Sequence, residues 1–135
     1  MYQWLAISFF LFFWNCVVQA QTQENSSLKD TIYTIAEQMP QPEGGYAKFY
    51  KYLQENLYYT QEALEKKIEG YVFVSFVVDK KGNLHNIKII KGLGYGLDEE
   101  VIRVFSESPP WVAGYNGNTP VNVKMTFQVL FKLPR

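Results

Sequence analysis

The sequence has no excess of charge of either sign and few of the residues that usually build metal sites. Its 135 residues include 13 lysines and arginines against 13 aspartates and glutamates, and no basic run stands out. We therefore expect no electrostatic surface for nucleic acid or anionic lipid. Because Cys16 is the single cysteine and His85 the single histidine, a metal site would have to be built mainly from carboxylates.

The first residues of the chain also lack charge. Residues 1–20 hold no charged side chain, and the apolar run Trp4–Trp14 is followed by small residues that end at Ala20. This pattern predicts a secretory signal peptide over residues 1–20, cleaved after Ala20. Since a basic segment is missing, a retained N-terminal anchor stays open, although a helix over Trp4–Val18 spans only about 22 Å of the roughly 30 Å hydrocarbon core. Both readings place the domain outside the cytoplasm.

The pattern after the signal predicts a leader and one domain. Residues 21–30 are polar and too poor in apolar side chains to pack, and prolines and glycines interrupt the chain before Tyr46. We expect a flexible leader over residues 21–42 and a folded domain over residues 43–135. The chain is 47% hydrophobic and 17% aromatic, which suffices for one packed core.

The spacing of apolar residues predicts the helices. One helix is expected over residues 46–57, because its apolar residues recur on a single face. Those residues are Tyr46, Phe49, Tyr50, Leu53 and Leu57. A short helical piece is expected over residues 61–67. Another helix begins near residue 97, where the acidic residues 98–100 suit a helix N-terminus, and it ends before the prolines at 109 and 110.

Three strands are expected between and after these helices. Residues 71–78 are β-branched and aromatic on both parities, which is typical of a central strand. A loop over residues 79–83, closed by Gly82, joins this strand to a half-exposed partner over residues 84–91. Residues 121–131 alternate between apolar and polar side chains, as in a strand with one buried face.

These elements predict an α+β fold with two layers. We expect a three-stranded, mostly antiparallel sheet with two helices on one face. Residues 71–78 take the middle of this sheet, so the last strand lies at an edge. The outer N–H and C=O groups of an edge strand are unpaired and can accept another extended chain.

No pattern in the sequence indicates catalysis, so we expect neither an enzyme nor a metal or cofactor site. His85 has no nucleophile pattern beside it, which favours a surface or packing histidine over a catalytic base. The acidic residues 98–100 are explained by a helix start, and the glycines within residues 92–96 by a turn and not a phosphate loop. Trp111 is expected to pack in the core and not to stack on a ligand.

Several sequence pieces, taken in order, resemble one protein family. They are Tyr59 with Ala63, Ile68–Val74, Phe76–Asp79 with Gly82, Leu97–Asp98 with Glu100, Pro110–Trp111, Gly114, Gly117, Pro120–Val121 and the alternation that ends at Leu133. Over roughly residues 39–133 the chain resembles the TonB C-terminal domain, in the energy-transducer form common in Bacteroidetes. It departs from the family pattern at Thr60 and Ala113, where proline is usual.

The resemblance implies a function. The family's C-terminal domain is a periplasmic interaction module that binds a segment of an outer-membrane TonB-dependent receptor by β-strand addition, in energy-coupled transport across the outer membrane. In the family the receptor segment adds to the last strand and contacts a Tyr-Pro region. The corresponding partner-binding residues here are Tyr58, Tyr59, Val121, Asn122, Val123, Lys124, Met125, Thr126, Phe127, Gln128 and Val129. For Tyr58 and Tyr59, core packing stays open as the alternative.

The sequence differs from the force-transmitting members of the family. Those members carry an anchor helix with a histidine and a long Pro-rich spacer, whereas the single histidine here is His85 and residues 21–42 reach at most roughly 75 Å when extended. One hypothesis is therefore contact with inner-membrane motor proteins through another subunit. The alternative is a periplasmic structural or regulatory binding protein that uses the same fold without motor coupling. A homodimer formed through the edge strand also stays open.

Overall fold

The computed structural model describes residues 31–135, and its compact unit runs from Ile32 to Arg135. The expected signal peptide or anchor over residues 1–20, and the first part of the expected leader, lie outside the described residues. Within residues 31–135 no helix combines the length and the apolar character needed to cross a membrane.

Three helices are present in the described part of the chain. They are α2 (Tyr46–Asn56), α3 (Gln61–Glu65) and α4 (Leu97–Ser106). Each matches a segment in which the sequence predicts helix, although α3 ends before residue 67. A side-chain cap explains the start of α3, because the Thr60 hydroxyl accepts a hydrogen bond from the Ala63 N–H at 3.2 Å.

The strands of the described residues form two sheets. Their bounds are β1 (Ile32–Tyr33), β2 (Gln41–Pro42), β3 (Gly70–Val78), β4 (Leu84–Lys91), β5 (Trp111–Val112), β6 (Gly114–Asn116) and β7 (Thr119–Phe131). The larger sheet has the order β1-β7-β3-β4, and β6 also pairs with β7. Only β1 runs parallel to its neighbour in this sheet, so the sheet is mixed. The structure confirms that β3 lies between β4 and β7.

The α+β class is confirmed, but the layout of three strands and two helices is not. The sequence missed β1, β2 and β5 because each has two residues, too few to show an alternating pattern. Residues 32–33 pair with β7 and residues 41–42 pair with β5. The folded unit therefore begins earlier than the expected boundary at residue 43, because these short pairings hold part of the expected leader against the sheets.

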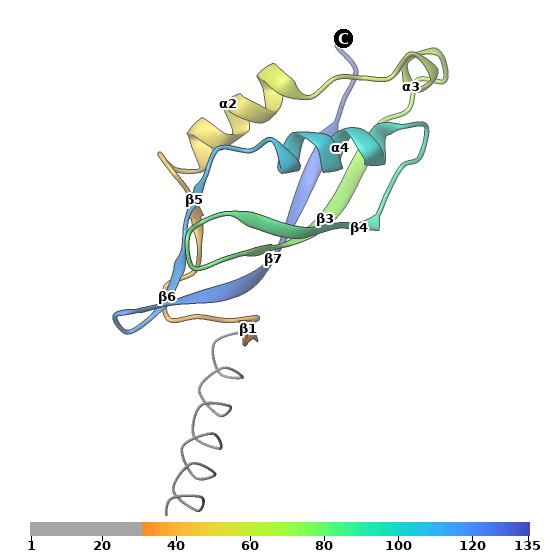
Figure 1. Cartoon of the computed structure of the whole chain (residues 1–135). Coiled ribbons are helices and arrows are strands. Elements are labelled where there is room, and N and C mark those ends of the chain that lie inside the picture. Colours follow the sequence, from red (N-terminus) through yellow and green to blue (C-terminus); the bar gives the residue numbers. More distant parts are fainter. Residues whose placement is uncertain (1–30) are drawn as a thin grey trace, which may run out of the picture. The chain divides into compact units, whose positions relative to one another are not determined.

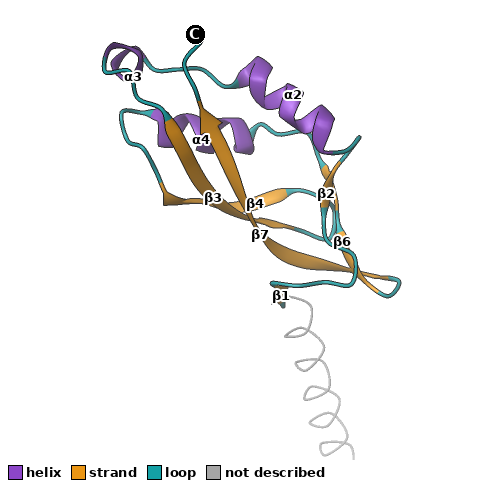
Figure 2. Cartoon of the chain, turned by 180° about the vertical axis from the view of Figure 1, so that it is seen from behind, coloured by secondary structure: helices purple, strands orange, loops and turns teal. Residues whose placement is uncertain are grey.

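The core lies between the sheet and two of the helices. Figures 1 and 2 show α2 and α4 on one face of the sheet, with β3 and β7 crossing beneath them. The ring of Phe49 on α2 lies 5.6 Å from Phe105 on α4, 5.2 Å from Trp111 and 5.5 Å from Phe127 on β7, between ring centroids. Trp111 is 3% exposed, which confirms its predicted place in the core.

Gly82 is required in the loop that joins β3 to β4. Its φ of 84° lies in the left-handed region, where side chains with a Cβ are strained. A Cβ there would also overlap the carbonyl oxygen of Trp111, whose N–H donates to the Gly82 carbonyl at 2.8 Å. The loop therefore closes as the sequence predicts, and it also positions β5.

Candidate functional site

The two edges of the larger sheet differ in regularity. Along β4, the pairing with β3 shifts register twice, and Asn86 has a φ of 51° within the strand. Such bulges break the even row of N–H and C=O groups that an added strand needs. Along β7, by contrast, the pairing with β3 runs from Gly70–Phe131 to Val78–Val123 without a shift. The regular edge is therefore the one on β7.

Among the described residues, the outer edge of β7 is covered only at one end. There β1 pairs in parallel with Asn122 and Val123. For residues 125–131, β3 is the only strand of the described chain that pairs with β7. The other side of this stretch is thus available to an incoming strand.

The hydrogen bonds of the turn after β3 indicate which main-chain groups of β7 face the free side. The Asp79 N–H donates to the Asn83 carbonyl at 2.9 Å, and the Asp79 carbonyl accepts from the Gly82 N–H at 2.9 Å. The main-chain groups of Asp79 therefore face β4. Because successive residues of a strand direct these groups to opposite sides, Val78 and every second residue before it face β7.

The same alternation applies to β7. Val123, the partner of Val78, directs its main-chain groups toward β3, as do the other odd-numbered residues up to Phe131. Side-chain burial alternates without interruption along this stretch, so no bulge breaks the pattern. The main-chain groups of Thr126, Gln128 and Leu130 consequently point outward. Pro120 has the same parity, so this strand already holds a proline at an outward-facing position.

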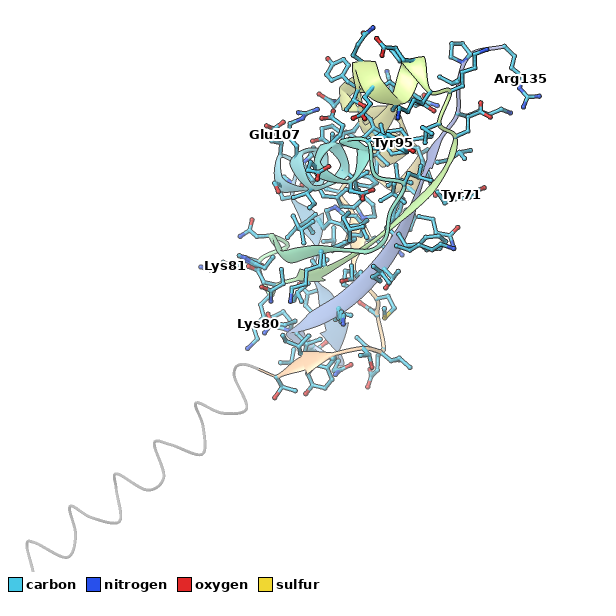
Figure 3. All side chains as sticks on the ribbon, turned by 90° about the vertical axis from the view of Figure 1, so that its right-hand side faces the viewer. Tyr71, Lys80, Lys81, Tyr95, Glu107 and Arg135 are labelled. Atoms are coloured by element: carbon cyan, nitrogen blue, oxygen red, sulfur yellow. The ribbon has the colours of Figure 1, made fainter. Side chains whose placement is uncertain are left out.

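A groove of about 590 Å³ runs beside the free edge. One wall comes from α2 and the residues after it, and the other from β7 with Tyr71 of β3. The residues of the first wall are Tyr50, Leu53, Gln54, Leu57 and Tyr59, and those of the second are Tyr71 and residues 128–132. Figure 3 shows Tyr71 on the side of the sheet opposite α4. An extended chain added to β7 would therefore lie in a concave channel.

A comparison with models of protein families supplies the identity of this fold. The family described as Gram-negative bacterial TonB protein C-terminal matches residues 55–133, more than half of the chain. The chain belongs to this family. TonB C-terminal domains are interaction modules of the periplasmic side of the envelope. The matched residues include the whole free edge and Tyr59, whereas Tyr50 and Gln54 precede them. No match was found among curated proteins.

The two tyrosines expected at the partner site of this TonB C-terminal domain differ in position. Tyr59 lines the groove, its ring packs edge-on against Phe131 at 5.5 Å, and its hydroxyl donates to the Ile68 carbonyl at 3.0 Å. Burial raises the pKa of this hydroxyl and the charge of Glu69 adds to the rise, so the hydroxyl stays a donor at neutral pH. Tyr59 therefore packs against the core and lines the groove at the same time.

Tyr58 lies outside the groove. It is 65% exposed, and the guanidinium carbon of Arg103 lies 5.8 Å from its ring centroid. Its N–H donates to the Glu100 carboxylate at 3.0 Å, which ties this turn to α4. The structure thus separates Tyr58 from the edge residues with which the sequence grouped it.

The residues expected on the last strand fall into three sets. Val121, Asn122 and Val123 pair with β6 or β1 as well as lying in β7, so their edge is already in use. Met125, Phe127 and Val129 direct their main chain toward β3 and their side chains toward the helices. Lys124, Thr126 and Gln128 have exposed side chains on the opposite face. The stretch of β7 that pairs with β3 alone therefore excludes residues 121–123 and continues to residue 131.

Sequence reasoning missed the helical wall of the groove. Tyr50, Gln54 and Leu57 line it together. They are spaced by four and three residues, so they share a face of the segment that contains α2. The sequence shows this spacing, but its helical pattern predicts that Tyr50 and Leu57 belong to the buried face. Tyr50 is in fact 52% exposed, and its ring centroid lies 5.6 Å from that of Phe127.

His85 forms a hydrogen bond with Asp79. Its Nε2 lies 2.6 Å from Asp79 Oδ2 at the exposed hairpin. Partial burial raises the pKa of the Asp79 carboxyl, but hydrogen bonds from the Asn83 N–H, the His85 ring and the Lys81 N–H outweigh it and lower the pKa below its usual value. Within residues 31–135 no cluster of histidine, cysteine and acidic side chains could hold a metal ion.

Proposed function

We propose that this TonB C-terminal domain binds an extended segment of an outer-membrane TonB-dependent receptor by β-strand addition to the outer edge of β7. The observation that supports the proposal is the outward, unpaired main-chain groups of Thr126, Gln128 and Leu130 beside the groove. Binding takes place in the periplasm, as the receiving step of energy-coupled transport across the outer membrane.

The chemistry of the edge supports this mode of binding. Each outward-facing residue offers an N–H and a C=O to the partner, and main-chain hydrogen bonds of this kind give affinity without requiring a particular sequence. Thr126, Gln128 and Leu130 offer such pairs. Tyr59, in the groove, would then contact the bound segment, whereas Tyr58 lies too far along the turn to line it.

Coupling to inner-membrane motor proteins, through another subunit, is the second part of the proposal. Binding of a receptor segment at β7 does not depend on this coupling. A structural or regulatory binding protein would use the same edge for a partner that is not a receptor. A panel of synthetic peptides from the periplasm-facing ends of receptors distinguishes the two, because only the receptor-binding protein captures members of this panel.

The substitution Thr126→Pro tests strand addition directly. It removes one outward N–H donor and places a proline ring on the edge, where the incoming strand must lie. The internal ladder with β3 does not use this N–H, and Thr126 is exposed. We expect receptor-peptide affinity, measured by isothermal titration calorimetry, to fall by about tenfold or more. The circular dichroism spectrum and the melting temperature should change little.

Two control variants separate the edge from the fold. Thr126→Ala keeps the N–H and should bind almost as well as the wild type. Met125→Pro, one residue away, removes an N–H that faces β3 and should lower the melting temperature strongly. A folded Thr126→Pro protein with unchanged affinity would refute strand addition at β7. If the edge instead pairs with a second copy, sedimentation will show a dimer that Thr126→Pro converts to a monomer.

A further inference from the structure

The segment that joins α2 to α3 supplies part of the groove wall. Leu57 and Tyr59 both line the groove, whereas Tyr58 between them does not. The backbone is extended at Leu57, where α2 ends, and at Thr60, where α3 begins. In an extended segment successive side chains point to opposite sides, which agrees with the alternation seen here. Residues 57 and 59 are therefore displayed to the groove, and their neighbours are free to make other contacts.

The residues on either side of Leu57 are attached to α4. The Asn56 carbonyl accepts a hydrogen bond from Arg103 Nη2 at 2.6 Å. The Tyr58 N–H donates to a carboxylate oxygen of Glu100 at 3.0 Å. Leu57 is thus held in the groove wall between two hydrogen bonds to one helix that does not itself line the groove.

Thr60 holds the other end of the segment. Its hydroxyl donates to the Tyr95 carbonyl at 2.5 Å, in the turn before α4, and accepts from the Ala63 N–H at 3.2 Å. Tyr59 therefore lies between two residues, Tyr58 and Thr60, that contact α4 or the turn before it. Both groove-lining residues of the segment are fixed from behind in the same way.

Arg103 connects the parts of this arrangement. Its Nε and Nη2 donate to the two Glu100 oxygens at 3.0 and 2.6 Å, and its Nη1 donates to Glu107 at 2.8 Å. A planar guanidinium can serve two carboxylates and the Asn56 carbonyl together, whereas an ammonium group lacks this fork. The hydrogen bond from Arg103, with a smaller effect from the Tyr58 N–H, outweighs partial burial and lowers the pKa of the Glu100 carboxyl. Glu100 therefore stays an ionised acceptor at neutral pH.

We propose that Arg103 is a positioning residue for partner binding. Through Glu100 and the Asn56 carbonyl it holds Leu57 and Tyr59 in the groove wall before the partner arrives. A wall that is already ordered loses less conformational entropy on binding, which increases the affinity. Arg103 does not line the groove, so it acts through the wall and not by touching the partner. This role rests on the proposed binding of a receptor segment beside the wall.

The substitution Arg103→Ala tests this role in the full chain. The affinity for a receptor peptide is measured by calorimetry at a temperature at which circular dichroism shows each protein to be folded. We expect the affinity to fall about fivefold. Lys51→Ala is the matched control, because it removes a cation from the pair with Glu55 on α2, outside the groove. It should leave the affinity unchanged.

Two further variants distinguish positioning from a general structural role. In a Leu57→Ala background the effect of Arg103→Ala should shrink to about twofold or less, because one of the side chains that Arg103 positions is gone. A general loss of structure would give the same factor in both backgrounds. Arg103→Lys keeps the charge but lacks the fork to Glu100, so its affinity should resemble that of Arg103→Ala.

The possible results separate this role from the proposed function. If the wild type binds the receptor peptide and Thr126→Pro does not, but Arg103→Ala binds like the wild type, strand addition stands and the positioning role is wrong. An equal loss with and without Leu57→Ala, or full binding by Arg103→Lys, would also refute positioning. If a folded Thr126→Pro protein binds as tightly as the wild type, the proposed function fails and the role of Arg103 fails with it.

Discussion

One aromatic side chain, that of Phe127, contacts both the buried core and a residue that lines the groove. The Phe127 ring contacts Phe49 on its buried side at 5.5 Å and the exposed Tyr50 at 5.6 Å. The position of Tyr50, and with it the helical wall of the groove, thus depends on core packing beneath it. A loss of packing at one residue is therefore expected to change both stability and recognition.

The substitutions Trp111→Ala and Phe76→Ala test the core. The two side chains are 3% and 1% exposed, and their rings lie 5.2 Å apart. Each truncation removes buried apolar surface and leaves a cavity, so the free energy of unfolding should fall by about 3–5 kcal/mol. Urea denaturation followed by circular dichroism measures the loss. Tyr58→Ala, at an exposed site, serves as the control and should cost little, whereas an unchanged midpoint in either core variant would show that the packing is described wrongly.

At the scale of elements, the hairpin of β3 and β4 depends on Asp79. Its carboxylate accepts hydrogen bonds from the Lys81 and Asn83 N–H groups at 2.8 and 2.9 Å and pairs with His85. The folded state lowers the pKa of this carboxyl below its ordinary value of 3.8. A lowered pKa stabilises the fold at pH values above the ordinary pKa, and this contribution disappears as the pH falls through the lowered one.

The variant Asp79→Asn isolates this contribution, because an amide oxygen can still accept from the loop N–H groups but carries no charge. At pH 6 the wild type should have the higher free energy of unfolding. Below about pH 4 the difference between the two proteins should shrink toward zero. Denaturant titrations from pH 6 to pH 2 measure it. A difference that stays constant or grows on acidification would contradict the assigned role of the carboxylate.

The sequence predicts well those elements in which the pattern of apolar residues repeats several times. The helical stripe around Phe49 and Leu53 and the alternation of residues 121–131 each extend over several repeats, so burial decides them. The two-residue strands β1, β2 and β5 have no period to detect. Their positions depend on neighbours far away in the sequence, such as Asn122 for Ile32.

The proposed binding site was predictable only in part, for the same reason. The alternation of the last strand and the central place of β3 indicate an edge, and the family pattern indicates Tyr59. The outward parity follows from the hydrogen bonds of Asp79, which the sequence does not show. The coverage by β1 and the helical wall with Gln54 are tertiary features, so the sequence could not exclude residues 121–123 or add Gln54.

At the scale of the whole molecule, the two edges of the larger sheet differ, and only one of them suits the addition of a partner strand. Bulges interrupt β4 on one edge, and β1 closes one end of the other edge. Within residues 31–135 one regular stretch of β7 stays open, and α2 forms a wall beside it. Natural sheets usually protect such an edge, because it invites uncontrolled pairing. An open edge next to a groove is therefore best explained by a partner.

Residue-resolved amide hydrogen exchange, with and without a receptor peptide, tests strand addition at β7 most directly. In the free domain the amides of Thr126, Gln128 and Leu130 should exchange fast, whereas those of Phe127 and Val129 should be protected by their pairing with β3. The peptide should slow the first three strongly and leave the other two protected. Fast exchange at Thr126, Gln128 and Leu130 in a saturated complex would contradict strand addition at this edge.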